Sequence, residues 1–386
     1  MQRSGIGTQD ETDDMVGMRC AIPRMTRRGF LQSAAIAGAG LAASGLPARA
    51  QTAASSTPRL KLGLDNFSLR ALGWKAAQLL DYAAAQKLDV VFFSDLKVFE
   101  SHEASYLRSI KAQADRLGIE IQVGTFSICP LSKSLTRDYG TPAEHLKLAL
   151  RIAAALGSRI VRCVLGSGED RLAEGGIERQ IEATVQVLRS VREPAIDAGI
   201  RFAVENHAGD MQAWELVALI EAAGKEFVGA TMDPGNAAWT IEDPMVNLET
   251  LAPYALASGI RDTSVWETPD GAHAQWTSIG EGNTYWPGYV SRFAELCPQT
   301  PFTLEIISQY GRSIPYFKDE FWNVFSKARA HEFARFVAFA KRGKPRLGYF
   351  VPPGRNRSEF EREFQKSDLE RSIQYCREVL EIGRKT

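Results

Sequence analysis

The stretch Arg201-Phe-Ala-Val-Glu205-Asn206-His207 joins a short apolar run to three polar side chains that directly follow it. The apolar part is typical of a strand buried on both faces of a parallel sheet. Residues 228–236, 256–262 and 302–305 repeat this pattern of an apolar run followed by polar residues. The carboxyl ends of parallel strands lie at the same end of a barrel. Glu205, Asp233 and Glu305 are therefore expected to meet there.

Strand-like and helix-like segments alternate along most of the chain. The strand-like runs are residues 60–67, 89–95, 119–126, 159–165, 201–205, 228–232, 256–260 and 302–306. The helical segments between them are residues 74–86, 104–117, 142–156, 177–198, 213–223, 244–251 and 286–296. Eight strand–helix units predict an α/β fold, a closed (β/α)8 TIM barrel. A dinucleotide-binding sheet is disfavoured, because Asp65-Asn66-Phe67-Ser68 follows the first strand in place of a glycine-rich turn.

Two segments are additions to this barrel, which we expect to span residues 59–343. The first is an aromatic-rich insertion after strand eight, residues 308–328. We expect it to cover the mouth of the barrel as a lid or to form a dimer contact, which would make the protein a homo-oligomer. The second is a C-terminal extension, residues 344–386, with an extra charged helix at 368–382 that packs outside the barrel.

The N-terminal residues 1–50 have the pattern of a twin-arginine signal peptide. Thr26-Arg27-Arg28-Gly29-Phe30-Leu31-Gln32 precedes a small-residue apolar run, and Ala48-Arg49-Ala50 supplies the cleavage pattern. The alternative is a chance arginine pair before an apolar helix. The apolar run is too short for a stable membrane span. We expect export to the periplasm by the twin-arginine machinery, cleavage after Ala50 and a linker at residues 51–58.

Charge and cysteine content limit the classes of partner. Lys and Arg number 46, Asp and Glu also 46, and no long basic stripe is present, so nucleic-acid binding is not expected. Four cysteines follow the predicted cleavage site: Cys129, Cys163, Cys297 and Cys376. They are widely spaced, which favours buried free thiols over a disulfide framework.

Each predicted site residue has a structural and a functional interpretation. A carboxylate behind an apolar strand must be paired or bound to a metal, so Glu205 forms either a salt bridge with an arginine such as Arg162 or a metal ligand. Asp233 begins Asp-Pro-Gly-Asn236, which is also good turn chemistry. Glu305 repeats the pattern of Glu205. Three carboxylates at one mouth repel one another unless a cation lies among them.

The predicted metal ligands are Glu205, Asp233 and Glu305. A site made mostly of oxygen donors favours Mn²⁺, Mg²⁺ or Co²⁺, with Zn²⁺ left open. His207 could bind the metal, orient a ligand or contact a substrate hydroxyl, and we assign it to substrate binding. Asn236 is expected near the same mouth.

These residues resemble the xylose-isomerase-like barrel superfamily of sugar phosphate isomerases and epimerases. The matching elements are Glu205-Asn206-His207, Asp233-Pro-Gly-Asn236, Arg261-Asp262, Leu304-Glu305 and the Gly280-Glu281-Gly282 element. The resemblance covers residues 60 to about 342. One departure is clear: the family's metal-binding histidine of strand seven corresponds to Gly259. Waters, His273 or His207 would complete the metal site, or the barrel has lost its metal.

The resemblance implies a metal-dependent isomerase or epimerase of a sugar or keto-sugar. Glu205 and Glu305 would be the catalytic base and acid in proton transfer next to a carbonyl. Arg261 would hold a substrate end or pair with Asp262. Arg162 and His273 are further substrate contacts. A periplasmic lyase acting on an oxidised sugar or glycoside is the first alternative, and a non-catalytic sugar-binding barrel is the second.

Overall fold

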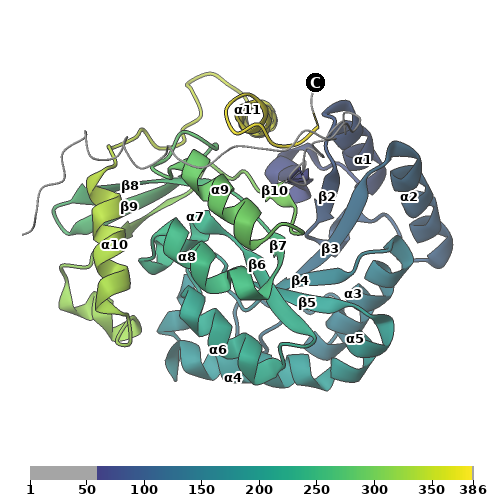
Figure 1. Ribbon diagram of the computed structural model, residues 1–386, viewed down its shortest axis with the longest axis horizontal. Coiled ribbons are helices and arrows are strands. Elements are labelled where there is room, and N and C mark those ends of the chain that lie inside the picture. Colours follow the sequence, from purple (N-terminus) through teal and green to yellow (C-terminus); the bar gives the residue numbers. More distant parts are fainter. Residues whose placement is uncertain (1–58, 385–386) are drawn as a thin grey trace, which may run out of the picture. The chain divides into compact units, whose positions relative to one another are not determined.

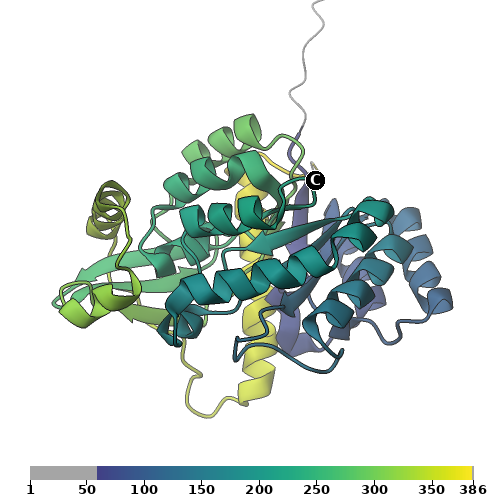
Figure 2. The same cartoon turned by 90° about the horizontal axis from the view of Figure 1, so that it is seen from below.

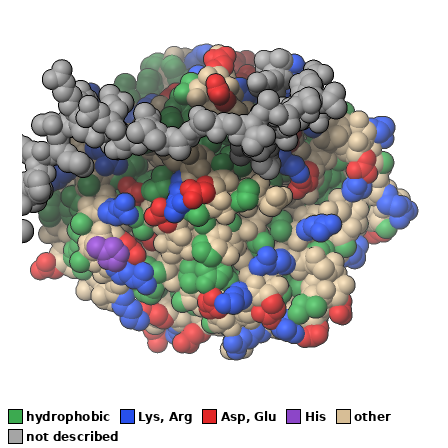
Figure 3. Space-filling view, in the orientation of Figure 1, with side chains coloured by type: hydrophobic (Ala, Val, Ile, Leu, Met, Phe, Trp, Pro, Cys, Tyr) green, Lys and Arg blue, Asp and Glu red, His purple; other side chains and the backbone are tan. Residues whose placement is uncertain are grey.

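The computed structural model describes residues 59–384. The predicted signal peptide and linker, residues 1–58, lie outside the described residues. In the described part, no helix has the length and apolar character needed to cross a membrane. Figure 3 shows acidic and basic side chains interspersed over the face that it presents.

Eight parallel strands form the main sheet, in the order β10-β1-β2-β3-β4-β5-β6-β7. They are β1 (Leu62–Asp65), β2 (Val90–Phe93), β3 (Glu120–Ser127), β4 (Ile160–Val164), β5 (Arg201–Glu205), β6 (Val228–Met232), β7 (Ala255–Ser258) and β10 (Phe302–Leu304). The ring is closed beyond β7, where Ile260 pairs with Leu304. The Ile260 amide donates to the Thr303 carbonyl at 2.7 Å. The predicted barrel is therefore confirmed (Figure 1).

The helices lie outside the ring of strands and cover it (Figure 1). They are α1 (Ala76–Ala85), α2 (Ala104–Leu117), α3 (Pro142–Leu156), α4 (Gly176–Ser190), α5 (Arg192–Ala198), α6 (Ala213–Ala223), α8 (Pro244–Leu251) and α9 (Trp286–Leu296). The segment predicted as one helix at 177–198 is divided at Val191 into α4 and α5. Short helical turns follow several strands, among them η1 (Asn66–Leu72) after β1 and α7 (Pro234–Ala237) after β6.

A second, antiparallel sheet of three strands stands beside the barrel. It consists of β8 (Asp262–Thr268), β9 (Gly271–Thr277) and β11 (Gly311–Ile314), in the order β11-β9-β8. The segment predicted as a lid or dimer contact, residues 308–328, contributes β11 and the helical turn η6 (Asp319–Val324). Four of its aromatic side chains pack in a second apolar cluster, together with Val265 and Ile314 of this sheet: Tyr316, Phe321, Trp322 and Phe325.

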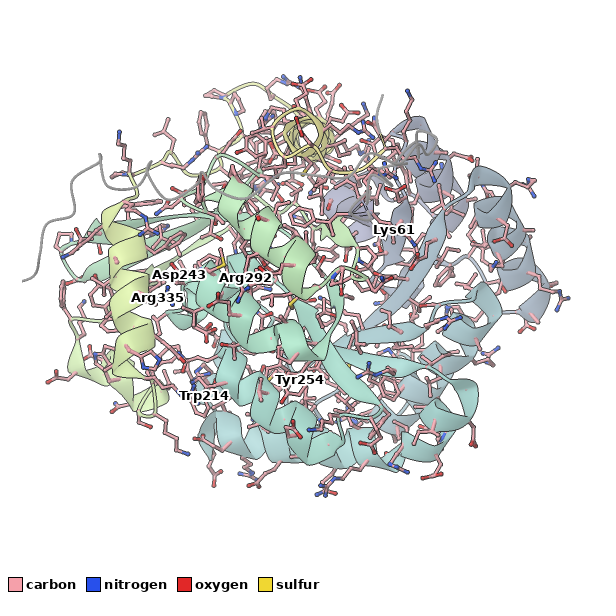
Figure 4. All side chains as sticks on the ribbon, viewed as in Figure 1. Lys61, Trp214, Asp243, Tyr254, Arg292 and Arg335 are labelled. Carbon is pink, nitrogen blue, oxygen red and sulfur yellow. The ribbon has the colours of Figure 1, made fainter. Side chains whose placement is uncertain are left out.

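The two last helices have different partners. α10 (Ala330–Lys341) buries Phe336 and Phe339 in the second apolar cluster. Arg342 directly follows α10, and its Nη2 lies 4.0 Å from Asp243 Oδ2. Asp243 precedes α8 and is labelled beside α10 in Figure 4. α11 (Arg357–Glu378) is longer than the predicted helix 368–382 and runs lengthwise beside the barrel (Figure 2).

α11 is part of the barrel's own packing and not only an external addition. Leu369, Ile373 and Cys376 are buried in the main apolar core. Ser372 also donates to the Asp368 carbonyl at 2.8 Å inside the helix. α11 thus packs against β10 and the helical turn η1 that follows β1. The four cysteines of the described residues are all buried and free, as predicted.

We predict that Leu369→Ala lowers the free energy of unfolding by about 2–5 kcal/mol, because a fully buried leucine leaves a cavity when it is truncated. Denaturant unfolding followed by circular dichroism measures this change. Gln374→Ala, an exposed position on the same helix, is the control and should change stability by less than about 0.5 kcal/mol. Equal effects of the two variants would show that α11 is not part of the core.

Candidate active site

The three carboxylates that were predicted from the sequence do meet at the C-terminal end of the barrel. Glu205 is the last residue of β5, Asp233 follows β6, and Glu305 follows β10. All three are at least 97% buried. One oxygen of each lies within 4.8 Å of an oxygen of the other two.

Glu205 is held by donors on both of its oxygens. Arg162 Nε donates to Oε2 at 2.6 Å, and Asn236 Nδ2 donates to Oε1 at 3.2 Å. Arg162 also donates through Nη1 to the Thr125 carbonyl at 3.0 Å. The salt bridge between Glu205 and Arg162, which was one of the two interpretations of the sequence, is therefore present.

Asp233 caps the short helix α7 and faces the other carboxylates at the same time. Its Oδ1 accepts from the amides of Gly235 and Asn236 at 2.8 and 3.0 Å. Its Oδ2 accepts from Asn236 Nδ2 and from Arg261 Nη2, both at 2.7 Å. Burial raises the pKa of the Asp233 carboxyl, and the positive charge of Arg261 opposes that rise. Asp233 therefore serves both as the cap of the turn at residues 233–236 and as a member of the charged cluster.

Arg261 joins Asp233 to Glu305. Its Nη2 lies 2.7 Å from Asp233 Oδ2 and 2.5 Å from Glu305 Oε2. The guanidinium lies 4.4 Å from the ring centre of Trp276. Arg261 does not pair with Asp262, which was one of the expected alternatives.

Asp262 has a different role. Its Oδ2 accepts from the amides of Gly280 and Gly282 and from Trp286 Nε1. A Cβ at Gly282 would lie 2.3 Å from Asp262 Oδ1, so the loop approaches closely only with glycine there. Asp262 therefore fixes the 280–282 loop.

His207 is a neutral hydrogen-bonding group. Its Nδ1 lies 2.6 Å from the Gly166 carbonyl oxygen, and an acceptor at that distance requires the proton on Nδ1. Nε2 is then left as an acceptor. Burial, followed by the charge of Arg162, lowers the pKa of His207 to about 4. The Phe126 ring packs edge-on against the imidazole at 5.4 Å.

Two buried acids at this end of the barrel were not singled out in the sequence. Asp65 ends β1 and accepts from Ser94 Oγ at 2.6 Å and from the Phe67 amide at 2.8 Å. Burial, followed by the negative charge of Glu305, raises its pKa to about 8. Asp210 accepts from the His207 amide at 2.7 Å and supports that loop. Asp65 shows the same strand-end pattern as Glu205, which is the signal that could have identified it.

A cavity of about 220 Å³ opens above the cluster. Its charged and polar lining includes Arg162, His207, Arg261 and Glu305. Its aromatic wall is formed by Phe67, Phe126, Trp276 and Tyr310. Glu205, Asp233 and Asn236 do not line it. They lie against the lining residues from within the barrel, through the contacts given above.

His273 is not brought to the cluster. It lies on β9, opposite Ser313 of β11, and its ring is 4.7 Å from that of Trp266. It does not line the cavity beside Glu305. The structure therefore brings together every predicted site residue except His273.

The spacing of the three carboxylates alone would suit a divalent ion. Such ions bind carboxylate oxygens at about 2.0–2.6 Å, so oxygens within 4.8 Å of one another can share one ion. In this arrangement of side chains, however, the residues do not fit an ion. Arg261 Nη2 already contacts Asp233 and Glu305. Gly259 offers no side-chain donor beside them.

The chain belongs to the xylose isomerase-like TIM barrel family, whose model matches residues 69–321. A 3-oxo-isoapionate decarboxylase from Pectobacterium atrosepticum is 22% identical over 186 residues. That stretch is 48% of this chain and 60% of the decarboxylase.

Solved structures share the fold at low identity. A D-psicose 3-epimerase, determined in the presence of D-fructose, has 14% identity and a TM-score of 0.55, over 83% of this chain and 99% of its own. A xylose isomerase-like TIM barrel protein from Mycobacterium smegmatis, in complex with magnesium, has 15% identity and a TM-score of 0.50. That match covers 74% of this chain and 99% of the other. These similarities show a common barrel.

We predict that the stability of the Asp65→Asn variant, relative to that of the wild type, increases as pH rises. The folded protein keeps the Asp65 proton up to about pH 8, whereas an unfolded chain releases it near pH 3.9. The folded state binds more protons between these values, so the wild type loses stability as pH rises through them. The neutral amide has no such loss.

The measurement is the difference in Tm between variant and wild type at pH 5 and at pH 8. Asp197→Asn, at an exposed position on α5, is the control and should show a difference that does not change with pH. A difference for Asp65→Asn that is equally constant would show that Asp65 is already ionised in the folded protein.

Proposed function

We propose that this chain is an enzyme that acts on a small free carbohydrate by moving a proton next to a carbonyl group. The observation that supports this most directly is Glu305, whose carboxylate lines the cavity beside two buried arginines. Its Oε2 accepts from Arg261. No hydrogen bond to its Oε1 is formed within the described residues, so this oxygen is free to take a proton.

The cavity suits a monosaccharide in size and character. Its volume of about 220 Å³ is below the range of about 300–1,000 Å³ that holds drug-sized ligands. The aromatic rings of the lining offer contact to the C–H face of a sugar ring or chain. Arg162, Arg261 and His207 of the same lining offer hydrogen bonds to its oxygens.

Isomerisation or epimerisation is the proposed reaction. Glu305 takes a proton from the carbon next to a carbonyl group. The electron pair of that C–H bond forms a C=C bond, and the carbonyl oxygen becomes negative. Arg261 and Arg162 donate hydrogen bonds to the enediolate oxygens and stabilise this charge. Return of the proton to the former carbonyl carbon, with transfer of the adjacent hydroxyl proton to the former carbonyl oxygen, gives isomerisation.

Epimerisation needs a second group that returns the proton on the opposite face. Glu205 remains the predicted group for that role. In the present arrangement Glu205 does not line the cavity and both of its oxygens are held by Arg162 and Asn236, so it would reach a substrate only after these contacts open. His207 Nε2 would accept the hydrogen of a substrate hydroxyl and orient the sugar.

A lyase is the second candidate, and the decarboxylase relative supports it. When CO₂ leaves, the electron pair of the broken C–C bond stays on the carbon next to a carbonyl. This produces the same enediolate. The same arginines would stabilise it. Exchange of a substrate C–H with deuterium from D₂O without CO₂ release indicates an isomerase or epimerase, and release of CO₂ indicates the lyase.

We predict that Glu305→Gln lowers kcat by at least about 100-fold, because general-base catalysis contributes about 10²–10⁴-fold. Sugar binding should persist, since the amide keeps the shape of the side chain. A substrate is first found by NMR with a panel of free keto-sugars and oxidised glycosides in D₂O. Turnover and calorimetric binding are then compared between variants.

Glu267→Gln, at an exposed position on β8, is the control and should retain full turnover. If Glu305→Gln turns over at the wild-type rate, Glu305 is not the base. If no member of the panel is turned over while sugars still bind, the chain is a sugar-binding barrel, which was the other alternative.

Export is the proposed route of the protein, by the twin-arginine machinery. The support is the order of motif, apolar run and cleavage pattern within residues 26–50. Sugar phosphates are scarce outside the cytoplasm, so the proposed substrate is a free sugar or glycoside.

We predict that the double variant Arg27→Lys, Arg28→Lys stays unprocessed in the cytoplasm, because the arginine pair is what the export machinery reads. Cell fractionation with mass spectrometry of the mature N-terminus measures this. The wild type should begin at Gln51 in the periplasmic fraction. Periplasmic recovery of the double variant in equal yield would contradict the proposal.

A further inference from the structure

We propose that the guanidinium of Arg261 is the resident cation of the three carboxylates, and that the folded protein holds no divalent ion among them. Arg261 Nη2 lies 2.7 Å from Asp233 Oδ2 and 2.5 Å from Glu305 Oε2. Asp233 and Glu305 are two of the three carboxylates whose oxygens lie within 4.8 Å of one another. An ion placed among them would meet a like charge at contact distance.

The position of Arg261 is built into its surroundings. A Cβ at Gly235 would lie 2.2 Å from Arg261 Cγ, so the stem of the arginine passes through space that only glycine leaves open. The ring of Trp276 covers the guanidinium at 4.4 Å. Trp276 is itself fixed, because its Nε1 donates to the Gly235 carbonyl at 3.1 Å. It also stacks on Trp239 at 3.9 Å.

The missing side chain at position 259 points at the same two oxygens. A Cβ built on Gly259 would lie 3.0 Å from Glu305 Oε2 and 3.9 Å from Asp233 Oδ2. A donor side chain at this position would therefore reach the place that Nη2 occupies. The chain has glycine there and fills that place from Arg261, two residues further along.

Two arginines contact all three carboxylates of the cluster. Arg162 pairs with Glu205, and Arg261 pairs with both Asp233 and Glu305. Both arginines are at least 97% buried. Each carboxylate of the cluster thus has an arginine within hydrogen-bonding distance, which offsets part of the cost of burying it.

Arg261 also faces the cavity, which extends the inference to the ligand. Of its two terminal nitrogens, only Nη2 bonds to a carboxylate within the described residues. Nε is buried without a partner in that part of the chain, and Nη1 is left available to a substrate oxygen. The ligand class is thus one with a carbonyl or hydroxyl oxygen that accepts from a guanidinium.

The test measures metal and not turnover, so it can fail while the proposed proton transfer stands, and the reverse. The wild-type protein, purified without chelator, is analysed for metals by mass spectrometry and titrated with MnCl₂ by calorimetry. We expect far less than one equivalent of any divalent metal and no Mn²⁺ binding at micromolar concentration. EDTA should leave its Tm unchanged.

Variants supply the reverse experiment. Arg261→Gln removes the resident cation, and Gly259→His with Arg261→Gln adds a nitrogen donor at the same oxygens. We expect the double variant to bind Mn²⁺ at least tenfold more tightly than the wild type. Arg335→Gln, which removes an exposed arginine on α10 (Figure 4), is the control and should bind no better than the wild type.

Several outcomes would overturn the inference. One is a stoichiometric divalent metal that remains in the wild type after dialysis. Another is a lower Tm of the wild type in EDTA. A third is Mn²⁺ binding that is the same with and without Arg261. If the Arg261 variants do not fold, the metal content and the EDTA response of the wild type still decide the question.

Discussion

Three carboxylates buried within 4.8 Å of one another must have positive charge beside them, and this requirement governs the C-terminal end of the barrel. Arg162 comes from β4 and Arg261 from the segment after β7, so the two charges reach the cluster from opposite sides of Asp233. The supporting features follow from this need. Gly235 leaves space for the arginine stem, Trp276 covers the guanidinium, and Asn236 bridges Glu205 and Asp233.

Most of the barrel could be predicted from the sequence, because strands buried on both faces are continuous apolar runs with clear ends. The hairpin of β8 and β9 could not, although Pro269-Asp270-Gly271 is a good turn signal between its strands. Its strands mix polar and apolar residues, because one face packs on α10. The start of α11 was also missed. Its first turns are mostly charged and exposed. The one signal for its start is Asn356, whose side chain accepts from the Glu359 amide.

The candidate site was predictable in its members and less so in its pairings. Position at a strand end was enough to bring Glu205, Asp233 and Glu305 together. The partners of Arg261 were not predictable, because its long side chain reaches the residues that follow β6 and β10, the strands on either side of its own. Which residues the side chain contacts depends on the register between strands, and the local sequence pattern does not determine that register. His273 was predicted at the site from its residue type alone. It lies instead on β9, opposite Ser313 of β11.

We propose that a guanidinium, and not an ion, lies among these carboxylates. Crystals of the full-length or processed protein grown in millimolar MnCl₂ test it directly through anomalous diffraction at the manganese edge. We expect no manganese peak among Glu205, Asp233 and Glu305. We also expect Arg261 Nη2 to remain within hydrogen-bonding distance of Asp233 and Glu305. A peak bonded to all three carboxylates, with Arg261 turned away, would contradict it.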